Sequence, residues 1–470
     1  VHMAQWLQSS APLSAMAVFA AYASVSYSVL RRINTEIPAP YMDEVFHVPQ
    51  AQHYCQGQFG AWDPKLTTPP GLYIISMVPA YLFRMLSPAD SSRWCSPEFL
   101  RSTNWMLSLL LFWTIYGLIR QLRPGLSTMA ATATTLSLSL LPVSFFLHHM
   151  YYTDTASLLL VLLSYSFSLS HCHIAAGIAG FLSLWLRQTN VVWIAFVGIS
   201  AALRQLQSRS RIVQPGDSLL GSIAQLCKWV ARLDGDVAEI LLLLTPYAAV
   251  ALCFMAFVHV NQGIVLGDKS NHEAVLHVPQ ILYFCSYVVG ISAPVTLPLA
   301  SPLWFVRQCA SRPVRNIVLG LSASLAMAIC IQRYTVEHPF LLSDNRHYPF
   351  YIWKNVFRRH WLARYAAIPA YVYATAAINR CLSNDTASLW RLVLALCTMA
   401  VLVPSPLLEF RYFTVPYFFI RLHMSSRSST RAVLLEALWF SAINAATLWV
   451  FINRPFVWAS EPGQLQRFMW

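Results

Sequence analysis

Charge is scarce in this sequence: only 11% of its 470 residues are Asp, Glu, Lys or Arg. Hydrophobic residues make up 57% and aromatic residues 13%, and the mean hydropathy is +0.50. A soluble globular enzyme is excluded, because such proteins carry about 25% charged residues. A disordered or fibrous chain is excluded as well, because burial of so much apolar surface offsets the entropy of ordering. An integral membrane protein remains.

Several motifs are also missing. The sequence has no CxxC pair, no GxxxxGK or GxGxxG loop, and no compact metal-ligand spacing of His and Asp. We therefore expect neither a zinc module nor a nucleotide cofactor, and no metal. Asp234 and Asp236 match DxD formally, but we interpret them as a helix cap. Cys55 and Cys95 could form a disulfide if their loop is lumenal; the alternative is that each fills apolar packing, as lone cysteines commonly do.

The charges that do occur are mostly basic. Lys and Arg number 32 against 19 Asp and Glu, which gives a net charge of +13. In a soluble protein this excess would suggest nucleic acid, but in a membrane protein it is typical of basic loops facing anionic cytoplasmic lipid. Membrane lipids are the expected partner, and nucleic acid is not.

Long apolar runs predict an all-α polytopic fold. A helix crosses the hydrocarbon core with about 20 mostly apolar residues and satisfies its own backbone hydrogen bonds there. We expect about 11 to 13 transmembrane helices in one polytopic domain, residues 1–470. The clearest runs are 11–30, 103–120, 128–147, 154–170, 174–203 (two spans broken at 187–190), 237–259, 279–300, 315–332, 361–380, 388–404 and 432–453.

Basic residues orient these spans. Alternation from a cytoplasmic N-terminus, with the first span retained, places Arg120, Arg123 and the loop 204–236 in the cytoplasm, in agreement with the positive-inside rule. Arg31 and Arg32 disagree, but the loop that follows them is long enough for its charges to count less. The non-cytoplasmic side then receives the first loop, 31–102, and four shorter segments: 148–154, 187–190, 261–278 and about 333–348.

The first loop carries adjacent carboxylates in the stretch PYMDEVFHVPQAQHYC. On a helix entered after Pro40, Asp43, His47 and Gln50 share one face, and Glu44 points elsewhere. A carboxylate with limited access to water can act as a general base toward a sugar hydroxyl. The alternatives are that the carboxylates cap or solvate a short surface helix and that His47 is structural.

Two later segments combine cations with aromatic residues. HPFLLSDNRHYPFYIWK, residues 338–354, contains Arg346, His347 and Lys354, which suit a phosphate at the membrane boundary. LLEFRYFTVPY, residues 407–417, contains Arg411. The alternatives are ion pairs between Asp344 and Arg346 and between Glu409 and Arg411.

Two polar turns could contact an oligosaccharide. The RQTN turn supplies Arg187 and Asn190, and the stretch NQGIVLGDKSNHEAVLH at 261–277 supplies Asp268. Exposed loops of a rigid scaffold often carry binding residues. Both segments could equally be ordinary polar turns.

Several long blocks together resemble one enzyme family. PYMDEVFHVPQAQHYCQGQFGAWDPKLTTPPGLY, LRQTNVVW, GIVLGDK with a following His, HPFLLSDNRHYPFY and LLEFRYFTVPY are similar to the signature blocks of the dolichyl-phosphate-glucose-dependent α-1,2-glucosyltransferases. They occur in that family's order between residue 40 and about residue 417. The cytoplasmic loop and the extreme C-terminus contribute little to the resemblance.

The resemblance implies a GT-C type glycosyltransferase that acts at the lumenal face of the endoplasmic reticulum membrane. It would add the last glucose to the lipid-linked oligosaccharide from dolichyl-phosphate glucose, with inversion and without a metal or other cofactor. The GT-C pattern places the base on Asp43 or Glu44, and we favour Asp43. Side chains for the donor phosphate are, in order of preference, Arg346, His347, Arg411 and Lys354. Side chains for the acceptor or sugar are His47, Gln50, Arg187, Asn190 and Asp268.

Two rival functions remain open at this stage. A related lumenal transferase could use a mannose donor or add an earlier glucose. A membrane transporter would also carry ionisable residues in its apolar core, but near the bilayer midplane. We expect a monomer whose substrates are the lipid-linked acceptor and the lipid-phosphate donor.

Overall fold

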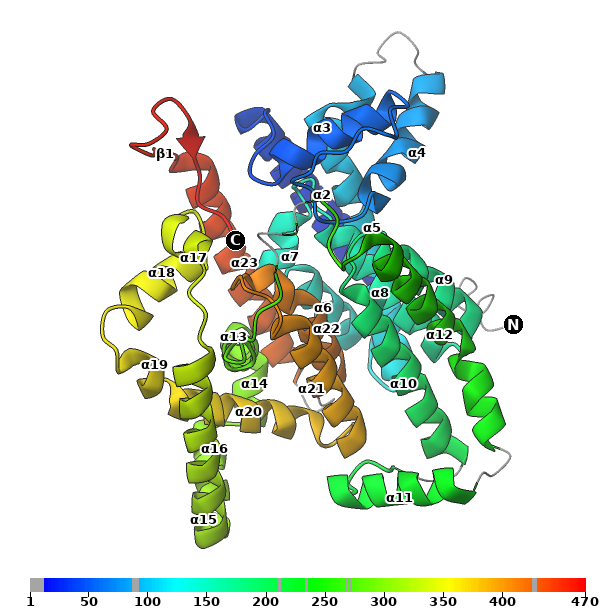
Figure 1. The fold of residues 1–470 in the computed structure, drawn as a ribbon, viewed down its shortest axis with the longest axis vertical. Coiled ribbons are helices and arrows are strands. Elements are labelled where there is room, and N and C mark those ends of the chain that lie inside the picture. Colours follow the sequence, from blue (N-terminus) through cyan, green and yellow to red (C-terminus); the bar gives the residue numbers. More distant parts are fainter. Residues whose placement is uncertain are drawn as a thin grey trace. The chain divides into compact units, whose positions relative to one another are not determined.

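The computed structural model describes residues 12–86, 93–209, 213–232, 236–267, 269, 273–424 and 429–470. In these ranges the chain is almost wholly helical and forms one short antiparallel ribbon (Figure 1). The helices group into two compact units, Val1–Ala202 with Asp236–His272 and Leu203–Gly235 with Glu273–Trp470. The all-α fold predicted from the sequence is confirmed.

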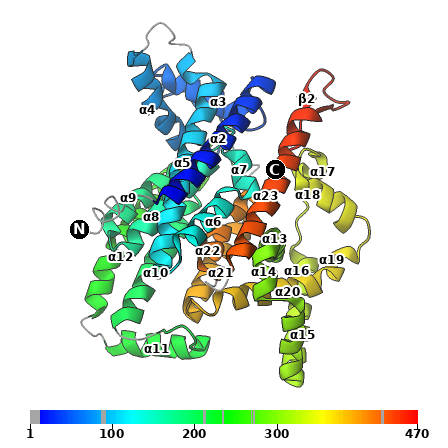
Figure 2. The ribbon, with the colours of Figure 1, turned by 180° about the vertical axis from the view of Figure 1, so that it is seen from behind.

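The first unit is built around the long helix α5. Ser96 caps this helix by accepting a hydrogen bond from the Phe99 amide at 3.3 Å, and Pro97 occupies its first position. Helices α2, α6 and α8 pack against α5, and α9 packs against α8 and α12 (Figure 2). The described elements of this unit are α2 (Leu13–Glu36), α3 (Glu44–Cys55), α4 (Gly71–Leu86), η2 (Arg93–Cys95), α5 (Pro97–Leu122), α6 (Thr128–Ser139), α7 (Pro142–Leu147), α8 (Asp154–Leu169), α9 (His173–Leu184), α10 (Asn190–Arg209, which ends in the second unit) and α12 (Asp236–Asn261).

The second unit has α13 and α20 at its centre. Arg421 and Glu436 form a fully buried ion pair between α22 and α23, with Nη2 and Oε2 2.7 Å apart. Its described elements are α11 (Leu219–Arg232), α13 (Gln280–Ile291), α14 (Ala293–Leu299), α15 (Pro302–Ser311), α16 (Pro313–Tyr334), α17 (Pro339–Ser343), α18 (Tyr348–Ile352), the π-helix η4 (Trp353–Phe357), α19 (Ala363–Ala366), α20 (Ile368–Leu382), α21 (Ser388–Leu402), η5 (Phe410–Phe413), α22 (Thr414–His423), α23 (Thr430–Asn453), β1 (Phe456–Val457) and β2 (Leu465–Gln466).

Among the described residues, six helices are long and apolar enough to cross a membrane, or seven if the bent pair α13 and α14–α15 forms one span. Shorter apolar helices, such as α8, α9 and α21, lie within other expected spans. The total of 11 to 13 spans therefore stays a prediction.

Two expected segments differ in detail. The run 128–147 was expected to be continuous, but it divides into α6 and α7 before Pro142, whose ring removes a backbone donor. The segment 204–236 was expected to be a cytoplasmic loop, but much of it is helical, because α11 occupies it. The break at the RQTN turn is confirmed, since α9 ends at Leu184 and α10 begins at Asn190.

Candidate active site

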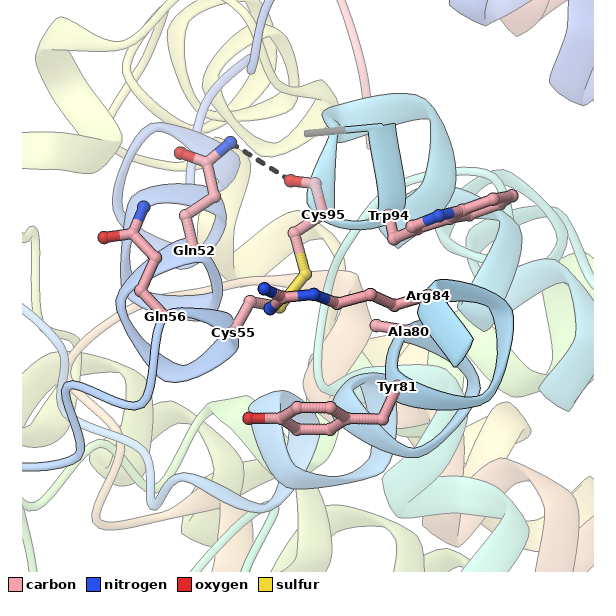
Figure 3. A pocket seen from close by; sticks show the side chains of 8 residues that line it. All are labelled: Gln52, Cys55, Gln56, Ala80, Tyr81, Arg84, Trp94 and Cys95. Atoms are coloured by element: carbon pink, nitrogen blue, oxygen red, sulfur yellow. Dashed lines mark hydrogen bonds between the residues drawn. A yellow bond between two sulfur atoms is a disulfide. The ribbon is translucent and has the colours of Figure 1, made fainter. Parts of the chain in front are cut away.

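A disulfide closes the first loop. Cys55 at the end of α3 is bonded to Cys95 in η2 (Figure 3). The alternative interpretation, in which these two cysteines only fill apolar packing, is therefore wrong. The Gln52 side-chain amide donates to the Cys95 carbonyl at 3.1 Å, so the two elements are joined by a covalent bond and a hydrogen bond.

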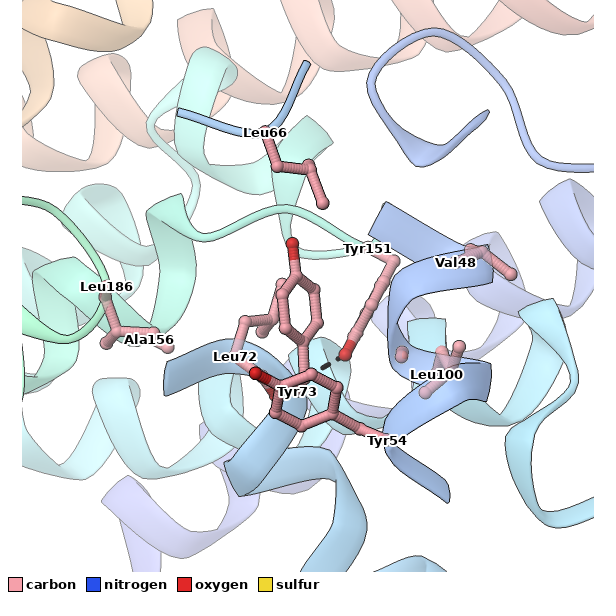
Figure 4. Close-up of a cluster of buried hydrophobic side chains, with 10 residues drawn as sticks. Val48, Tyr54, Leu66, Leu72, Tyr73, Leu100, Tyr151, Ala156 and Leu186 are labelled. Carbon is pink, nitrogen blue, oxygen red and sulfur yellow. Dashed lines mark hydrogen bonds between the residues drawn. The ribbon is translucent and has the colours of Figure 1, made fainter. Parts of the chain in front are cut away.

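A buried aromatic cluster lies beneath this loop. Tyr54 from α3, Tyr73 from α4 and Tyr151 from the turn before α8 lie close together (Figure 4). The rings of Tyr54 and Tyr73 are 5.5 Å apart, and the Tyr151 hydroxyl bonds that of Ser76 at 2.8 Å. Burial, with the neighbouring Tyr151, Tyr54 and Asp63, raises the pKa of Tyr73 far above its usual range, so its hydroxyl stays protonated. The cluster fixes α3 and α4 on the helices below them.

Two glycines let separate segments of the first unit meet the first loop. A β-carbon on Gly71 would overlap the Trp185 carbonyl oxygen, to which the Gly71 amide donates at 2.8 Å. Gly267 has a φ of +63°, and its α-carbon faces the carbonyl oxygens of Pro64 and Leu66. Both positions require glycine. The segments 185–190 and 261–267 therefore pack on the first loop, and the lumenal assignment of all three stays a prediction.

Glu44 lies at the centre of a closed network. It is fully buried and paired with Arg101 of α5, with Oε2 and Nη2 2.6 Å apart. Its oxygens also accept hydrogen bonds from Arg101 Nε at 2.9 Å, the Tyr151 amide at 2.7 Å and the Tyr41 amide at 3.1 Å. Arg101 in turn donates to the carbonyl oxygens of Ile37 and Ala39 at 2.7 and 3.0 Å. The pair therefore holds residues 37–44 against α5 and the turn at Tyr151.

Asp43 precedes Glu44 and has different surroundings. It is half-buried at the N-terminal end of α3, and within the described backbone no amide donates to its carboxylate as a helix cap. Its own amide donates to the Tyr152 hydroxyl at 3.2 Å. Met42, immediately before it, has a φ of +56°, a strained conformation of a kind that clusters at functional sites. Asp43 therefore differs from Glu44 in burial and in the backbone conformation that precedes it.

His47 and Gln50 occupy the face of α3 that the sequence predicts. His47 is buried and its Nδ1 lies 2.7 Å from the Tyr73 hydroxyl. Gln50 is also buried, and its amide nitrogen donates to the Ala61 carbonyl at 2.6 Å while its oxygen accepts from the Asp63 amide at 2.9 Å. Gln50 therefore holds the segment after α3 in place, and its contact with sugar stays a prediction.

The RQTN turn also makes internal contacts. Arg187 donates to the Asp154 carboxylate at 2.9 Å and so joins this turn to the start of α8. Asn190 is buried, and its amide donates to the Ser157 hydroxyl at 2.8 Å and the Ser183 carbonyl at 2.9 Å. Arg187 keeps 19% of its side chain exposed, so of the two it is the better placed for a ligand. Asp268 lies outside the described residues.

Arg346 in the second unit forms a two-point ion pair with Asp344. Its Nε and Nη2 donate to the two carboxylate oxygens at 2.8 and 2.7 Å, and its Nη1 donates to Gln466 at 2.9 Å. Burial by itself raises the pKa of Asp344, but the hydrogen bonds and charges of Arg346 and His347 outweigh it and lower the pKa. The ion pair considered as an alternative is present. The Arg346 side chain remains 18% exposed.

The segment 456–470 covers the same region. The Met469 amide donates to the Arg346 carbonyl at 2.7 Å, and His347 Nδ1 lies 2.8 Å from the Trp470 carbonyl oxygen. The Arg346 guanidinium lies over the Trp458 ring at 4.5 Å. The extreme C-terminus, which contributes little to the family resemblance seen in the sequence, therefore contacts Arg346 and His347 directly.

The two other predicted cations differ in exposure. Lys354 on η4 is exposed, with its ammonium 5.6 Å from the centre of the Phe350 ring. Arg411 on η5 pairs with Glu409, as the alternative interpretation held, and keeps 23% of its side chain exposed. The neighbouring Phe410 ring lies 6.1 Å from that of Trp470, so η5 and the segment 456–470 meet within the second unit.

Sequence reasoning missed three participants. Arg101 is one of them, and a lone Arg entering the apolar stretch LRSTNWMLSLLLFW was a usable signal for a buried ion pair. Tyr152, which accepts from the Asp43 amide, was visible only as part of an aromatic turn. The segment 456–470 carried two tryptophans among polar residues but no motif.

Comparison with known proteins gives a single family. A sequence model described as the DIE2/ALG10 family matches residues 37–422. A protein of Arabidopsis thaliana named "Dol-P-Glc:Glc(2)Man(9)GlcNAc(2)-PP-Dol alpha-1,2-glucosyltransferase" is 36% identical over 93% of this chain and 96% of its own length. Proteins of the same name from Rattus norvegicus and Homo sapiens are 34% and 33% identical over 95% of this chain and 96% of their own lengths. No solved structure matches.

Proposed function

The chain belongs to the DIE2/ALG10 family, and from this premise we propose that it is a dolichyl-phosphate-glucose-dependent α-1,2-glucosyltransferase. The donor is dolichyl-phosphate glucose and the acceptor is the lipid-linked oligosaccharide that already carries two glucoses, the two substrates printed in the relatives' names. The observation that supports the proposal most strongly is similarity over nearly the whole chain, because the family model alone covers residues 37–422, which include every candidate site residue.

The base of the reaction is Asp43. The surroundings of Glu44 favour Asp43 over it, because four donor contacts engage the Glu44 oxygens and its side chain is fully buried. Asp43 is half-buried, does not cap α3, and follows Met42, whose backbone conformation is strained. A carboxylate of this kind can accept the proton of a sugar hydroxyl in the transition state.

The chemical step is a single displacement with inversion. The acceptor's 2-hydroxyl oxygen forms a bond to the anomeric carbon of the donor glucose while the bond from that carbon to the phosphate oxygen breaks. The proton passes from the hydroxyl to Asp43, and the electron pair leaves with dolichyl phosphate. Glucose that is β-linked in the donor thereby becomes α-linked in the product.

The departing phosphate needs positive charge, and the second unit supplies the candidates. Arg346 remains the first choice because its planar guanidinium can bind two phosphate oxygens at once. It is paired with Asp344, so a phosphate must share it. The set of proposed phosphate-binding cations also includes His347, Arg411 and Lys354. Together these cations stabilise the negative charge of the departing phosphate, a role that a divalent metal would otherwise fill.

The first loop faces the lumen of the endoplasmic reticulum in this proposal. The Cys55–Cys95 disulfide supports that side, because disulfides persist in the oxidising secretory compartments and are rare in the cytosol. The reaction then takes place at the lumenal face of a multi-pass membrane protein that works as a monomer.

The test is a transfer assay with purified protein, lipid-linked acceptor and donors charged with glucose or mannose. Wild type should transfer only glucose, and only to the acceptor that carries two glucoses. Asp43→Asn should lower kcat about 10²- to 10⁴-fold, the usual contribution of a general base. Asp63→Asn is the matched control, because Asp63 lies in the same loop and accepts from the Lys65 amide, a bond that Asn can keep.

Three results would overturn the proposal. Mannose transfer, or transfer to an acceptor with one glucose or none, would indicate a different lumenal transferase. If Asp43→Asn turned over at the wild-type rate, Asp43 would not be the general base. No transfer by a folded wild-type protein, together with substrate uptake into vesicles, would favour a transporter.

A further inference from the structure

A pocket of about 470 Å³ opens in the first loop, at the C-terminal end of α3, opposite the end next to Asp43. It lies between the second half of α3, the second half of α4 and η2, with the Cys55–Cys95 disulfide in its wall (Figure 3). Its volume falls within the range of about 300–1,000 Å³ that is typical of small-molecule sites. None of the sequence motifs assigns a role to it.

The pocket lining combines two kinds of group. Tyr81 and Trp94 supply aromatic rings, and Trp94 is held in place by stacking on Phe83, with ring centres 5.2 Å apart. Gln52 and Gln56 supply planar amides from successive turns of α3, and Arg84 extends from α4 across the disulfide in Figure 3. Aromatic rings bind flat apolar faces, and amides both donate and accept hydrogen bonds.

This combination matches a sugar better than a lipid phosphate. A sugar ring has an apolar C–H face and an edge of hydroxyls, each of which can donate and accept. Phosphate oxygens only accept, so they could use the N–H groups of Gln52 and Gln56 but not their carbonyl oxygens. Arg84 is the only cation among the residues lining this described pocket.

The distance between Asp43 and this pocket limits which part of a glycan could bind in the pocket. Gln52 and Gln56 follow Asp43 by nine and thirteen residues along α3. At about 1.5 Å per residue they lie roughly 14 to 20 Å from it along the helix axis. One sugar ring cannot span that distance, but the acceptor named for the relatives contains two glucoses, nine mannoses and two N-acetylglucosamines.

We propose that this pocket is a glycan-binding subsite for the acceptor, which holds mannose residues remote from the glucose that reacts. The inference rests on the proposed function, because it assumes the same acceptor. Binding here adds affinity for the complete oligosaccharide and leaves the chemical step unchanged. The pocket therefore lets the enzyme distinguish a finished glycan from one that carries only the correct terminal arm.

The experiment compares two lipid-linked acceptors in nanodiscs of one lipid composition. One is the complete oligosaccharide, and the other carries only the glucosylated arm. Wild type should have the lower KM for the complete acceptor. Tyr81→Ala and Gln56→Ala should each raise that KM about tenfold, the effect of roughly 1.4 kcal/mol of lost contacts, with kcat unchanged. The KM for the short acceptor should change less than twofold.

The control is Met85→Ala, a change of a highly exposed residue on α4 that does not line the pocket, and it should alter neither KM. Equal losses for the two acceptors, or no loss for the complete one, would overturn the proposal. So would an effect of Arg84→Ala that depends on anionic lipid content and not on the acceptor, because this would indicate a lipid headgroup. Failure of the proposed function is distinct, since wild type would then transfer no glucose to either acceptor.

Discussion

The Glu44–Arg101 pair of the first unit and the Asp344–Arg346 pair of the second unit join the same chemical groups in different surroundings. Both side chains of the first pair are fully buried, whereas those of the second remain 18% and 19% exposed. Each carboxylate oxygen of Glu44 accepts a hydrogen bond from a backbone amide, and Arg101 donates hydrogen bonds to backbone carbonyl oxygens. Arg346 instead adjoins His347 and two side chains of the segment 456–470.

The difference supports a scaffold role for the first pair and the proposed phosphate-binding role for the second. A buried pair whose every oxygen is engaged cannot accept a substrate without leaving a charge unpaired in the protein interior. A partly exposed pair can exchange one partner for a phosphate, because water and neighbouring donors compensate the carboxylate. Motifs with similar residues in sequence therefore differ in function through burial.

The largest expected effect comes from breaking the buried pair. Glu44→Gln should lower the free energy of unfolding by about 3–5 kcal/mol, because Arg101 is left as an uncompensated buried charge. Thermal unfolding of purified protein in detergent measures this. The double variant Glu44→Leu with Arg101→Met should recover part of the loss. The control is Arg32→Ala, which removes an exposed pair with Glu36 and should cost less than about 0.5 kcal/mol. Equal losses in Glu44→Gln and Arg32→Ala would refute the distinction.

The next effect concerns the Asp344–Arg346 pair, which is partly exposed. Arg346→Ala should raise the KM for dolichyl-phosphate glucose about 10- to 100-fold, since a charge-assisted hydrogen bond contributes about 1.5–3 kcal/mol. Arg346→Lys keeps the charge but loses the planar fork, so it should restore only part of the affinity. The KM for the acceptor should not change in either variant. An unaltered donor KM in Arg346→Ala would remove this residue from the phosphate site.

The smallest effect is a dependence of stability on pH. Because the pKa of Asp344 is lowered in the folded protein, its ion pair stabilises the fold above the ordinary value of 3.8 and is lost as the pH falls through the folded value. The gain should be no more than about 1 kcal/mol, since the pair is partly exposed. Wild type and Asp344→Asn should therefore differ in melting temperature at pH 6 and converge below pH 4. A difference that grows toward low pH would contradict this sign.

Much of the local structure was predictable from sequence because its causes are local. Apolar runs predicted the helices, and the start of α3 followed from Pro40 and the polar residues after it. The Asp344–Arg346 pair joins residues two positions apart, so it could be considered from sequence alone. The break at the RQTN turn was likewise visible as a polar interruption of an apolar run.

The contacts that separate scaffold from site were not predictable, because they join distant residues. Arg101 reaches Glu44 across 57 positions, and Trp458 donates to Asn345 across 113. Adjacent carboxylates look equivalent in sequence, and only the fold shows that Glu44 is enclosed whereas Asp43 is half-buried. Asn190 likewise looked like a ligand and proved to be buried in helix packing.

Gly71 carries a consequence for natural variation. Any side chain there would force α4 away from the Trp185 carbonyl and displace the wall of the first loop, although no group that takes part in chemistry would have changed. We expect missense alleles at this codon to lower the yield of folded protein, because the clash is with backbone that cannot move aside cheaply.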